Sequence, residues 1–596
     1  MTVFRACLLV WLFFSLAVSQ QETAAGLKAA GSEVDVLVLG SEPEGVMAAV
    51  AAAQEGARTV LVTLDARLGG LFVTGKMNFL DLRSHPGRYQ RGLFEAWWDR
   101  VGRRSSFDVR RAEEAFEAML REARVEVIRS AGSMTPMLEA GRVRGVRLPG
   151  RELYAAQTID ATADADIAAS AGAAYTVGFA SLGLEARMAD TLVLRIDGVD
   201  WPQLRRGIKG RGDGYAQVNP HAAWGPFGGY PAAYGAAEPG IRLRGLNLGL
   251  QEDGSVLMNA LLIYGIDPFD PASRAEGKAR AEREAPRIVA YLRELPGFAG
   301  ARFGGAAETL YIRETRHTKT LCTLSVDDVM DNVVTELDVV AGGYPLDVQT
   351  LTPDDSGFVY GLPSIYGARL CVAVPEGVDN LWIAGKAAGY DPLAASSARV
   401  VPFGMALAEA VGVAAAQAVK LGLSTSDFAK NPERIFSLRE RLRQRGAYLP
   451  AVRPRAPSGP FEHEFWEAYR VLRQRGLALG GYENNPRLDD AMPALSYAYL
   501  LSNVGRRFHG NDALGKNLLG RHGALSGPLT PELALTLTKE VACELNLCPE
   551  RDWQALRAKG LAPKRFPPQA NLTRGEAYAL AAALAGIDAG ATALSE

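Results

Sequence analysis

The stretch VDVLVLGSEPEGVMAAVAAAQEGARTVLV, residues 34–62, decides the fold of this chain. It begins with Val34–Gly40, an apolar and largely β-branched run of strand length that ends in glycine. The alanine-rich segment Val46–Gln54 then predicts a buried helix, and Thr59–Val62 predicts a second buried strand. A strand, a tight turn, a helix and another strand in this order predict the start of a parallel sheet.

The turn Gly40-Ser41-Glu42-Pro43-Glu44-Gly45 lies where a dinucleotide fold places a diphosphate. The free N–H groups and the positive dipole end of the following helix favour an anion there. Gly40 and Gly45 match the first and third glycines of the G-x-G-x-x-G pattern, but Glu42 replaces the middle one. Its side chain obstructs close approach of a phosphate. Glu42 and Glu44 could instead stabilise the helix N-terminus as an anion would.

The end of the second strand departs from the same pattern. An acidic residue about 20 residues beyond the glycines normally holds the ribose hydroxyls. Thr63 occupies that place, and Asp65 follows two residues later. Asp65 therefore has two interpretations: it reaches the ribose, or it caps the loop before Gly69 and Gly70.

Composition bounds the class of protein. The chain has 596 residues, too many for one compact core. Its 65 Lys and Arg and 67 Asp and Glu give a net charge of −2, which argues against a nucleic-acid binder. Beyond Cys7, the four cysteines are too dispersed for a zinc site, so we expect no metal. Cys543 and Cys548 either form a local disulfide or remain two free thiols.

The N-terminus has the pattern of an export signal. Arg5 precedes the apolar run Ala6–Val18, and Ala17-Val18-Ser19 offers a small-x-small cleavage site. No arginine pair precedes the run, so we expect a Sec-type signal peptide over residues 1–19. The mature protein would then lie in the periplasm, in the cell envelope or outside the cell. The alternative is an uncleaved membrane anchor.

Beyond these segments the sequence resembles one family at several places in the expected order. They are LGG at Leu68–Gly70, TIDATADAD at Thr158–Asp166, RETRHTKTLCTLSVDDVM at Arg313–Met330, NLWIAGKAAG at Asn380–Gly389, and ARVVPFGMALAEAVGVAAA from Ala398. This order is similar to the FAD-dependent oxidoreductase family with the glutathione-reductase-like fold. The resemblance covers about residues 33–445 and implies that the cofactor is FAD.

The resemblance implies an α/β fold with a parallel-sheet, Rossmann-like FAD-binding domain. We expect its two parts at residues 33–175 and 311–445. An inserted α+β cap or substrate domain, rich in Gly, Pro, Trp and Tyr, would span residues 176–310. A helical C-terminal domain would follow over residues 456–596, after a Pro-rich linker.

The resemblance also implies roles for cofactor-binding residues. Gly40 and Gly45 would frame the diphosphate, Gly69 and Gly70 would lie beside the flavin, and Ala161 and Thr162 would pass under the adenosine. Gly385 and Lys386 would lie near the flavin phosphates or ribityl chain, although a solvated surface lysine is the alternative. Arg399 and Pro402 would direct the N-terminus of the last long helix towards the isoalloxazine. Two further glycine positions of the family carry Ala163 and Ala165 here.

Catalytic candidates come from the RETRHTK segment. His317 could act as a base, because imidazole titrates near neutral pH, or it is a structural hydrogen-bond donor. Arg313 and Arg316 could hold a substrate carboxylate, or they form ion pairs with Glu314 or Asp327. A second glycine fingerprint and a C-x-x-C pair are both absent from the sequence. A pyridine-nucleotide-dependent disulfide reductase is therefore not expected.

Two segments of the C-terminal domain resemble each other. LTPELALTLTKEVA begins at Leu529 and LTRGEAYALAAALA at Leu572, each with a threonine that can cap a helix and a glutamate in its first turn. Both are similar to S-layer homology repeats, which would imply attachment to the cell envelope, although ordinary capped helices are the alternative.

Two functions follow as hypotheses. The first is an exported FAD-dependent oxidoreductase acting on a small molecule. The second is a binding or structural protein that keeps the flavoprotein fold but has lost FAD.

Overall fold

The computed structural model describes residues 34–586 with short gaps. The gaps are 81, 83–88, 213, 355–356, 453–459, 512, 523–524, 549–551, 564–565 and 567–569. The signal peptide expected over residues 1–19 lies outside the described residues.

The first 29 described residues form the unit that the sequence predicts. Strand β1 (Val34–Leu39) leads into helix α2 (Pro43–Gln54), and β2 (Thr59–Val62) returns parallel to β1. The helix starts at Pro43 rather than Val46, because proline is well suited to the first turn of a helix, where no N–H is needed.

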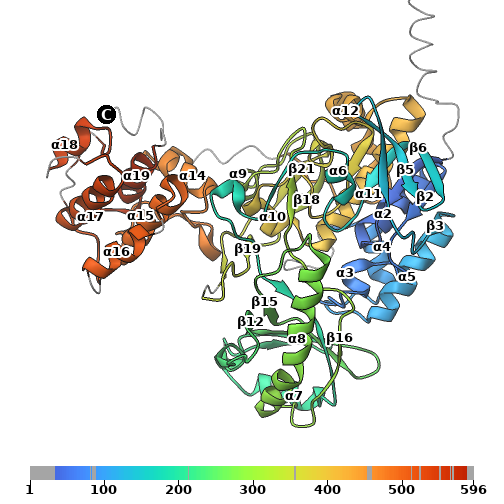
Figure 1. The fold of residues 1–596 in the computed structure, drawn as a ribbon, viewed down its shortest axis with the longest axis horizontal. Helices are drawn as coiled ribbons and strands as arrows, with labels where there is room; N and C mark the ends of the chain where they lie inside the picture. The colour runs from blue at the N-terminus through green and yellow to red at the C-terminus, as the bar shows by residue number, and fades with distance from the viewer. Residues whose placement is uncertain are drawn as a thin grey trace, which may run out of the picture.

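The main sheet has the order β3-β2-β1-β6-β5-β4, and β22 pairs with β6. Strands β3, β2, β1, β6 and β22 run parallel, whereas β4 and β5 form an antiparallel hairpin at Ala140-Gly141. The remaining strands of this sheet are β3 (Glu126–Ile128), β4 (Thr135–Glu139), β5 (Arg142–Leu148), β6 (Arg151–Asp160) and β22 (Leu381–Ile383). The fold is α/β, and β22 joins a segment more than 200 residues away in sequence to the first sheet (Figure 1).

Helices α2 and α11 (Val401–Leu421) pack against each other and against the main sheet. Helix α11 packs closely on α2, and a Cβ on its Gly412 would come within 2.3 Å of the carbonyl oxygen of Ala48. Among the helices that the structure describes, α11 alone is long and apolar enough to cross a membrane. Its most apolar window is 89% buried within the protein, as expected for a core helix. Helix α5 (Val109–Glu122) lies nearby and is capped by the side chain of Asp108.

A second sheet is antiparallel and lies in the inserted segment, at the bottom of Figure 1. Its order is β10-β11-β13-β14-β9-β16, and α8 (Pro271–Tyr291) packs against β16. Its strands are β9 (Leu194–Asp197), β10 (Gln217–Val218), β11 (Ala222–Gly225), β13 (Leu246–Leu250), β14 (Val256–Met258) and β16 (Arg302–Ala306).

The C-terminal region is helical and has a hydrophobic core of its own. Three backbone hydrogen bonds close a ring within it: Met492 N–H to Leu572 O (2.8 Å), Leu572 N–H to Leu529 O (2.8 Å), and Leu529 N–H to Met492 O (2.7 Å). A helix follows each of the three residues: α15 (Ala494–His509), α17 (Pro531–Glu544) and α19 (Arg574–Leu584). The two similar segments of the sequence therefore have a third counterpart, which starts at Met492.

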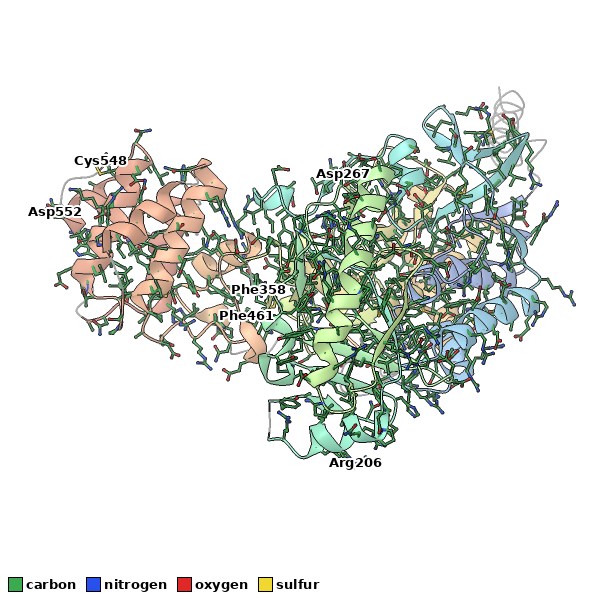
Figure 2. All side chains as sticks on the ribbon, turned by 60° about the horizontal axis from the view of Figure 1, so that its bottom comes forward. Arg206, Asp267, Phe358, Phe461, Cys548 and Asp552 are labelled. Atoms are coloured by element: carbon green, nitrogen blue, oxygen red, sulfur yellow. A yellow bond between two sulfur atoms is a disulfide. The ribbon has the colours of Figure 1, made fainter. Side chains whose placement is uncertain are left out.

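Helix α14 (Trp466–Gln474) joins this helical region to the rest of the molecule. The guanidinium group of Arg473 contacts the carboxylates of Asp327 at 2.5 Å and Asp331 at 2.8 Å. The hydroxyl of Tyr360 donates to the carbonyl oxygen of Arg473 at 2.6 Å. Figure 2 shows the region extending away from this joint, with Cys548 and Asp552 at its far end.

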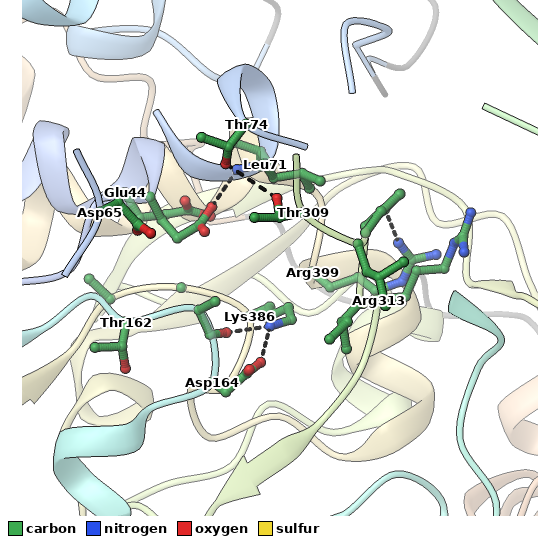
Figure 3. Close-up of a pocket in the computed structure, with 18 of the residues that line it drawn as sticks. Glu44, Asp65, Leu71, Thr74, Thr162, Asp164, Thr309, Arg313, Lys386 and Arg399 are labelled. Atoms are coloured by element: carbon green, nitrogen blue, oxygen red, sulfur yellow. Dashed lines mark hydrogen bonds and ion pairs between the residues drawn. The ribbon is translucent and has the colours of Figure 1, made fainter. Parts of the chain in front are cut away.

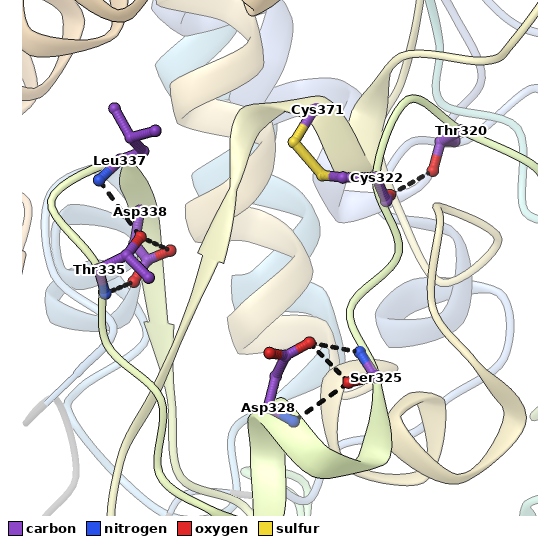
Figure 4. The surroundings of a disulfide bond; sticks show 8 residues. All are labelled: Thr320, Cys322, Ser325, Asp328, Thr335, Leu337, Asp338 and Cys371. Carbon is purple, nitrogen blue, oxygen red and sulfur yellow. Dashed lines mark hydrogen bonds between the residues drawn. A yellow bond between two sulfur atoms is a disulfide. The ribbon is translucent and has the colours of Figure 1, made fainter. Parts of the chain in front are cut away.

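Two disulfides are formed. Cys543 and Cys548 pair, which decides between the two alternatives that the sequence left open. Cys322 and Cys371 form a second disulfide that was not expected, since 49 residues separate them in sequence. Figure 4 shows this bond joining two neighbouring chain segments beside the capped N-terminus of α9 (Val326–Met330).

Candidate functional site

The turn after β1 brings the ends of β1 and β6 into direct contact. Gly40 has a φ of +129°, and a Cβ there would come within 2.1 Å of the carbonyl oxygen of Ala161. A Cβ on Gly45, in the first turn of α2, would lie 2.8 Å from the Gly40 oxygen. Both positions therefore need glycine. The turn holds the N-terminus of α2 at the carboxyl ends of two parallel strands, where open α/β sheets bind ligands.

The loop after β6 is fixed by Asp160. Its carboxylate accepts hydrogen bonds from Thr162 N–H (3.0 Å), Thr162 Oγ1 (2.6 Å) and Ala168 N–H (2.8 Å). Burial raises the pKa of Asp160 to about 6 despite these bonds. Thr162 lines a pocket, whereas Ala161 is fully buried beneath the turn.

Glu42 lies between α2 and the loop after β2. Its Oε2 accepts the backbone N–H of Leu71 at 2.9 Å. A Cβ on Gly70 would lie 2.3 Å from the Glu42 carboxyl carbon, so the glycine makes room for this side chain. Desolvation by the surrounding protein raises the pKa of Glu42. At the edge of the pocket, the backbone N–H of Leu71 is therefore already hydrogen-bonded to the carboxyl group of Glu42.

Glu44 is buried in the first turn of α2. A Cβ on Gly404 of α11 would lie 2.3 Å from its Oε1, so a second glycine accommodates a second glutamate. Burial, with a smaller contribution from the nearby Glu42, raises the pKa of Glu44 to about 8. Glu44 is therefore mostly protonated at neutral pH, which lowers the negative charge at this end of the pocket.

The loop after β2 docks on the glycine turn. The N–H of Gly69 donates to the carbonyl oxygen of Ser41 at 2.7 Å, and the Ser41 hydroxyl donates to the Asp65 carboxylate. Gly69 has a φ of +90°, a conformation that favours glycine. Asp65 is exposed and lines the pocket, so it both fixes the loop and faces the space where a ligand would lie.

Gly385 and Lys386 follow β22 at the same edge of the sheet. Gly385 has a φ of +137°, and a Cβ there would meet no atom within 4 Å, because it would project into the pocket that this residue lines. Lys386 Nζ contacts the Asp164 carboxylate at 2.5 Å and also donates to the carbonyl oxygen of Ala163. Burial opposes ionisation of Asp164, but Lys386, Thr315 and Arg316 together hold its pKa below the usual value. Lys386 is therefore a positioned cation and not a solvated surface lysine.

Arg313 and Arg399 lie together at the end of the pocket away from Glu44 and Asp65 (Figure 3). Arg399 Nη1 donates to the hydroxyl of Tyr311 at 3.0 Å, and the Arg313 guanidinium lies 4.4 Å from the centre of the Tyr311 ring. Pro402 is buried in the first turn of α11, where the adjacent Val401 lines the pocket.

The pocket has a cavity volume of about 220 Å³ and is open to solvent. Small-molecule and cofactor sites are typically roughly 300–1,000 Å³, so this cavity is smaller than most such sites. The acidic and basic residues lie at opposite ends of the pocket. Glu42, Glu44 and Asp65 line one end, and Arg313 and Arg399 line the other. Sequence reasoning missed Glu44 as a pocket residue, and also Tyr311, Asp164, Thr309 and Arg274. Glu44 in the glycine turn, Asp164 in the TIDATADAD segment and Tyr311, two residues before the RETRHTK segment, each lie in or beside a segment that the sequence singled out.

His317 and Arg316 are not among the residues that line this pocket. His317 Nε2 lies 3.0 Å from Glu314 Oε1 in the buried strand β17 (Arg316–Thr318). Arg316 Nη1 contacts Asp166 at 2.6 Å and the carbonyl oxygen of Asp164 at 2.7 Å. Of the three catalytic candidates, the structure places only Arg313 at the pocket.

Comparisons with known proteins agree with this geometry. The model of the family described as FAD dependent oxidoreductase matches residues 35–442. A comparison with curated proteins gives no match.

Solved structures show similar chains at low identity. A geranylgeranyl bacteriochlorophyll reductase-like protein from Thermoplasma acidophilum is 14% identical, with 69% of this chain and 83% of that chain covered and a TM-score of 0.33. The p-nitrophenol 4-monooxygenase PnpA from Pseudomonas putida is 12% identical, with 74% and 92% covered and a TM-score of 0.36. Neither likeness bears on the substrate. The family match spans more than half of the chain, and this protein belongs to the FAD-dependent oxidoreductase family.

Proposed function

We propose that this protein is an exported oxidoreductase that uses FAD to oxidise or reduce a small molecule. The observation that carries the proposal is the pocket at the carboxyl ends of β1, β6 and β22. It opens beside a turn that only glycine can form, in the domain that the family model matches.

The residues of the pocket suit FAD, with one exception. Gly385 leaves a cradle that a Cβ would fill, and Lys386 supplies a cation beside it. The N-terminus of α2 favours a diphosphate, and the N-terminus of α11 favours negative charge on the isoalloxazine. The exception is Glu42, whose carboxylate accepts the Leu71 N–H. Before a phosphate can bind there, Glu42 must either give up this hydrogen bond or be protonated, so that it no longer repels the phosphate.

Each part of the chain would then have a defined role. The Gly40–Gly45 turn would hold the diphosphate, with Lys386 nearby, and Gly69, Gly70 and Thr162 would flank the cofactor. Bound FAD would supply the two-electron redox chemistry, and the protein would orient the substrate and exclude water.

The test is the visible absorption spectrum of the purified mature protein, before and after incubation with FAD and removal of free cofactor. We expect retained flavin bands. As a matched control, Gly40→Val, whose side chain would collide with Ala161, should retain no flavin. Flavin lost from the wild-type protein as completely as from Gly40→Val would contradict the proposal.

That outcome would favour the second candidate, a binding or structural protein without a cofactor. The observation behind it is that Glu42 already satisfies a backbone donor at the edge of the pocket. A protein of this kind would bind no FAD at any pH, although circular dichroism would show it folded.

Export is proposed from the apolar N-terminal run and is supported by two disulfides, which persist in oxidising compartments. Removal of residues 1–19 should leave the protein in the cytoplasm with its cysteines reduced. Thiol counting on the two forms, after cell fractionation, tests this directly. Equal export of the truncated chain would exclude the signal.

Attachment to the cell envelope through residues 456–596 is proposed from the three similar turn-helix units that close around Met492, Leu529 and Leu572. A chain ending before residue 456 should leave the envelope fraction and appear in the soluble fraction. Retention of FAD by the shortened chain is the control for folding. If the shortened chain stays with the envelope, this role is wrong.

A further inference from the structure

A second pocket is separate from the one that would hold FAD. It opens between the N-terminal part of α5 and the antiparallel sheet of the inserted segment, and its cavity volume is about 320 Å³. Small-molecule sites typically measure roughly 300–1,000 Å³ and are common where two domains meet. No residue lines both pockets. The second pocket therefore has the size and the place of a ligand site of its own.

Hydrogen bonds between the two domains fix one side of this pocket. The N–H of Val109 donates to Gln251 Oε1 at 3.0 Å, and Gln251 Nε2 donates to the carbonyl oxygen of Phe107 at 3.0 Å. The N–H of Glu252 donates to the Asp108 carboxylate at 3.1 Å. The pocket is therefore held in shape by the protein itself, which lowers the ordering cost of binding a ligand.

The arginines and carboxylates of this pocket already have partners. Arg67 contacts Glu113 at 2.6 Å. The other two lining arginines are paired in the same way: Arg110 with Glu114 at 2.6 Å and Arg195 with Asp253 at 2.8 Å. The remaining lining carboxylates are also engaged, Asp108 by backbone N–H groups and Glu252 by Arg111. These charges are therefore compensated within the protein.

Lys76 is the one lining cation without such a partner among the described residues. It is half-buried, and its Nζ donates to the carbonyl oxygen of Ala306 at 3.0 Å, which leaves two N–H donors. The nearby Glu308 is instead bound by Arg67 at 2.5 Å. Burial lowers the pKa of Lys76, and Glu308 opposes this effect only in part. The pocket thus contains one ammonium group that no carboxylate of the described chain pairs with.

The backbone at Lys76 is also unusual. Its φ of +51° lies in the left-handed region, which favours glycine. Strained backbone of this kind is concentrated at functional sites. The preceding Thr74 lines the FAD pocket, so one short segment forms part of the wall of both pockets.

We propose that the second pocket binds a small organic acid whose single carboxylate contacts the ammonium group of Lys76. The carboxylate would accept the free N–H donors and supply the paired counter-charge. Val109 and Leu257 add apolar lining for the body of the acid. A second negative charge on the ligand would meet the carboxylates that line the pocket, which favours a monocarboxylic acid over a diacid. The site takes no part in binding FAD.

The experiment titrates benzoate and hexanoate, and their neutral amides, into the purified protein with saturating FAD present. FAD occupies the other pocket, so an acid that binds must use a different site. The readouts are calorimetry and ligand-observed NMR. We expect at least one acid to bind with a Kd below about 1 mM, and its amide to bind at least about tenfold more weakly.

Variants locate the site. Lys76→Met removes the charge and keeps most of the side-chain length, so it should weaken binding of the acid by at least about tenfold. Lys76→Gly suits the left-handed backbone and should fold at least as well as the wild type, yet it should lose binding to the same extent. Lys209→Met is the matched control, because Lys209 is exposed at the end of α7 (Trp201–Lys209). It should bind the acid as the wild type does.

The inference is wrong if the acids bind no better than their amides, if neither acid binds, or if Lys76→Gly binds the acid as Lys209→Met does. Lys76→Gly carries this comparison even if Lys76→Met does not fold. Failure of the proposed function is distinguishable, because a protein that retains no flavin should still bind the acid in a way that depends on Lys76.

Discussion

Replacement of Glu42 by glycine should tighten FAD binding. The substitution restores the third backbone position of the glycine turn to a residue without a side chain, and it frees the Leu71 N–H that Glu42 now occupies at 2.9 Å. A hydrogen bond to a charged group contributes about 1.5–3 kcal/mol. A diphosphate that no longer has to displace this bond should bind about 10- to 150-fold more tightly. Glycine is itself well tolerated at a helix N-cap, which is the position Glu42 holds, so the fold should survive.

The assay is titration of FAD into cofactor-free protein, followed by flavin fluorescence and by calorimetry. Glu42→Gln is the matched variant, because it keeps the size of the side chain and removes its charge. If the charge of Glu42 is the main obstacle to FAD binding, Glu42→Gln should show most of the gain in affinity of Glu42→Gly. If the size of the side chain is the main obstacle, only Glu42→Gly should bind FAD more tightly. Wild-type affinity should also rise as pH falls, because desolvation already raises the pKa of Glu42 and the neutral acid does not repel phosphate. Equal or weaker FAD binding by Glu42→Gly would refute the reasoning.

Three further outcomes are expected. Because the pKa of Glu44 is raised to about 8, its contribution to stability is fully present below about pH 4.5 and is lost as pH rises towards 8. Urea unfolding at pH 5.5 and 8 should therefore show a loss on the order of 1–3 kcal/mol that is absent in Glu44→Gln; an equal loss in both would contradict it. Gly40→Ala places a Cβ 2.1 Å from the Ala161 oxygen. It should lower the melting temperature much more than Gly150→Ala does, because a Cβ on the exposed Gly150 would meet no atom within 4 Å. Arg473→Ala removes the guanidinium that links α14 to Asp327 and Asp331, while Arg470 still contacts Asp327, and should make the C-terminal region more sensitive to limited proteolysis, at a cost of about 1.5–3 kcal/mol; unchanged proteolysis would mean that other contacts hold the C-terminal region in place.

Much of the first domain could be predicted because its signals are local. The β-branched run, the glycines and the alanine-rich helix of residues 34–62 fix each element from its own sequence. The helix caps at Thr530 and Thr573 are likewise short-range patterns, and the structure confirms both of them.

Features that depend on contacts between distant segments could not be predicted. The Cys322–Cys371 disulfide is formed only because the chain folds back over 49 residues. The third turn-helix unit lacks the threonine that marks the other two, so Met492 gave no signal until the hydrogen-bond ring was visible.

The RETRHTK segment shows the same limit at the site. Arg313 and His317 are four residues apart, and the sequence alone made both of them catalytic candidates. The backbone of this segment directs Arg313 to the pocket and His317 to Glu314. Glu42 is similar: its position was evident, but its partner at Leu71 depended on how the next loop packs.

The most direct measurement is a crystal structure of the protein grown with FAD at pH 6. The account expects the diphosphate beside the Gly40–Gly45 turn, with the Glu42 side chain turned away from Leu71 N–H. It expects the isoalloxazine between Gly69-Gly70 and the N-terminus of α11. A structure at saturating FAD in which Glu42 still holds Leu71 N–H and the pocket contains only solvent would contradict it.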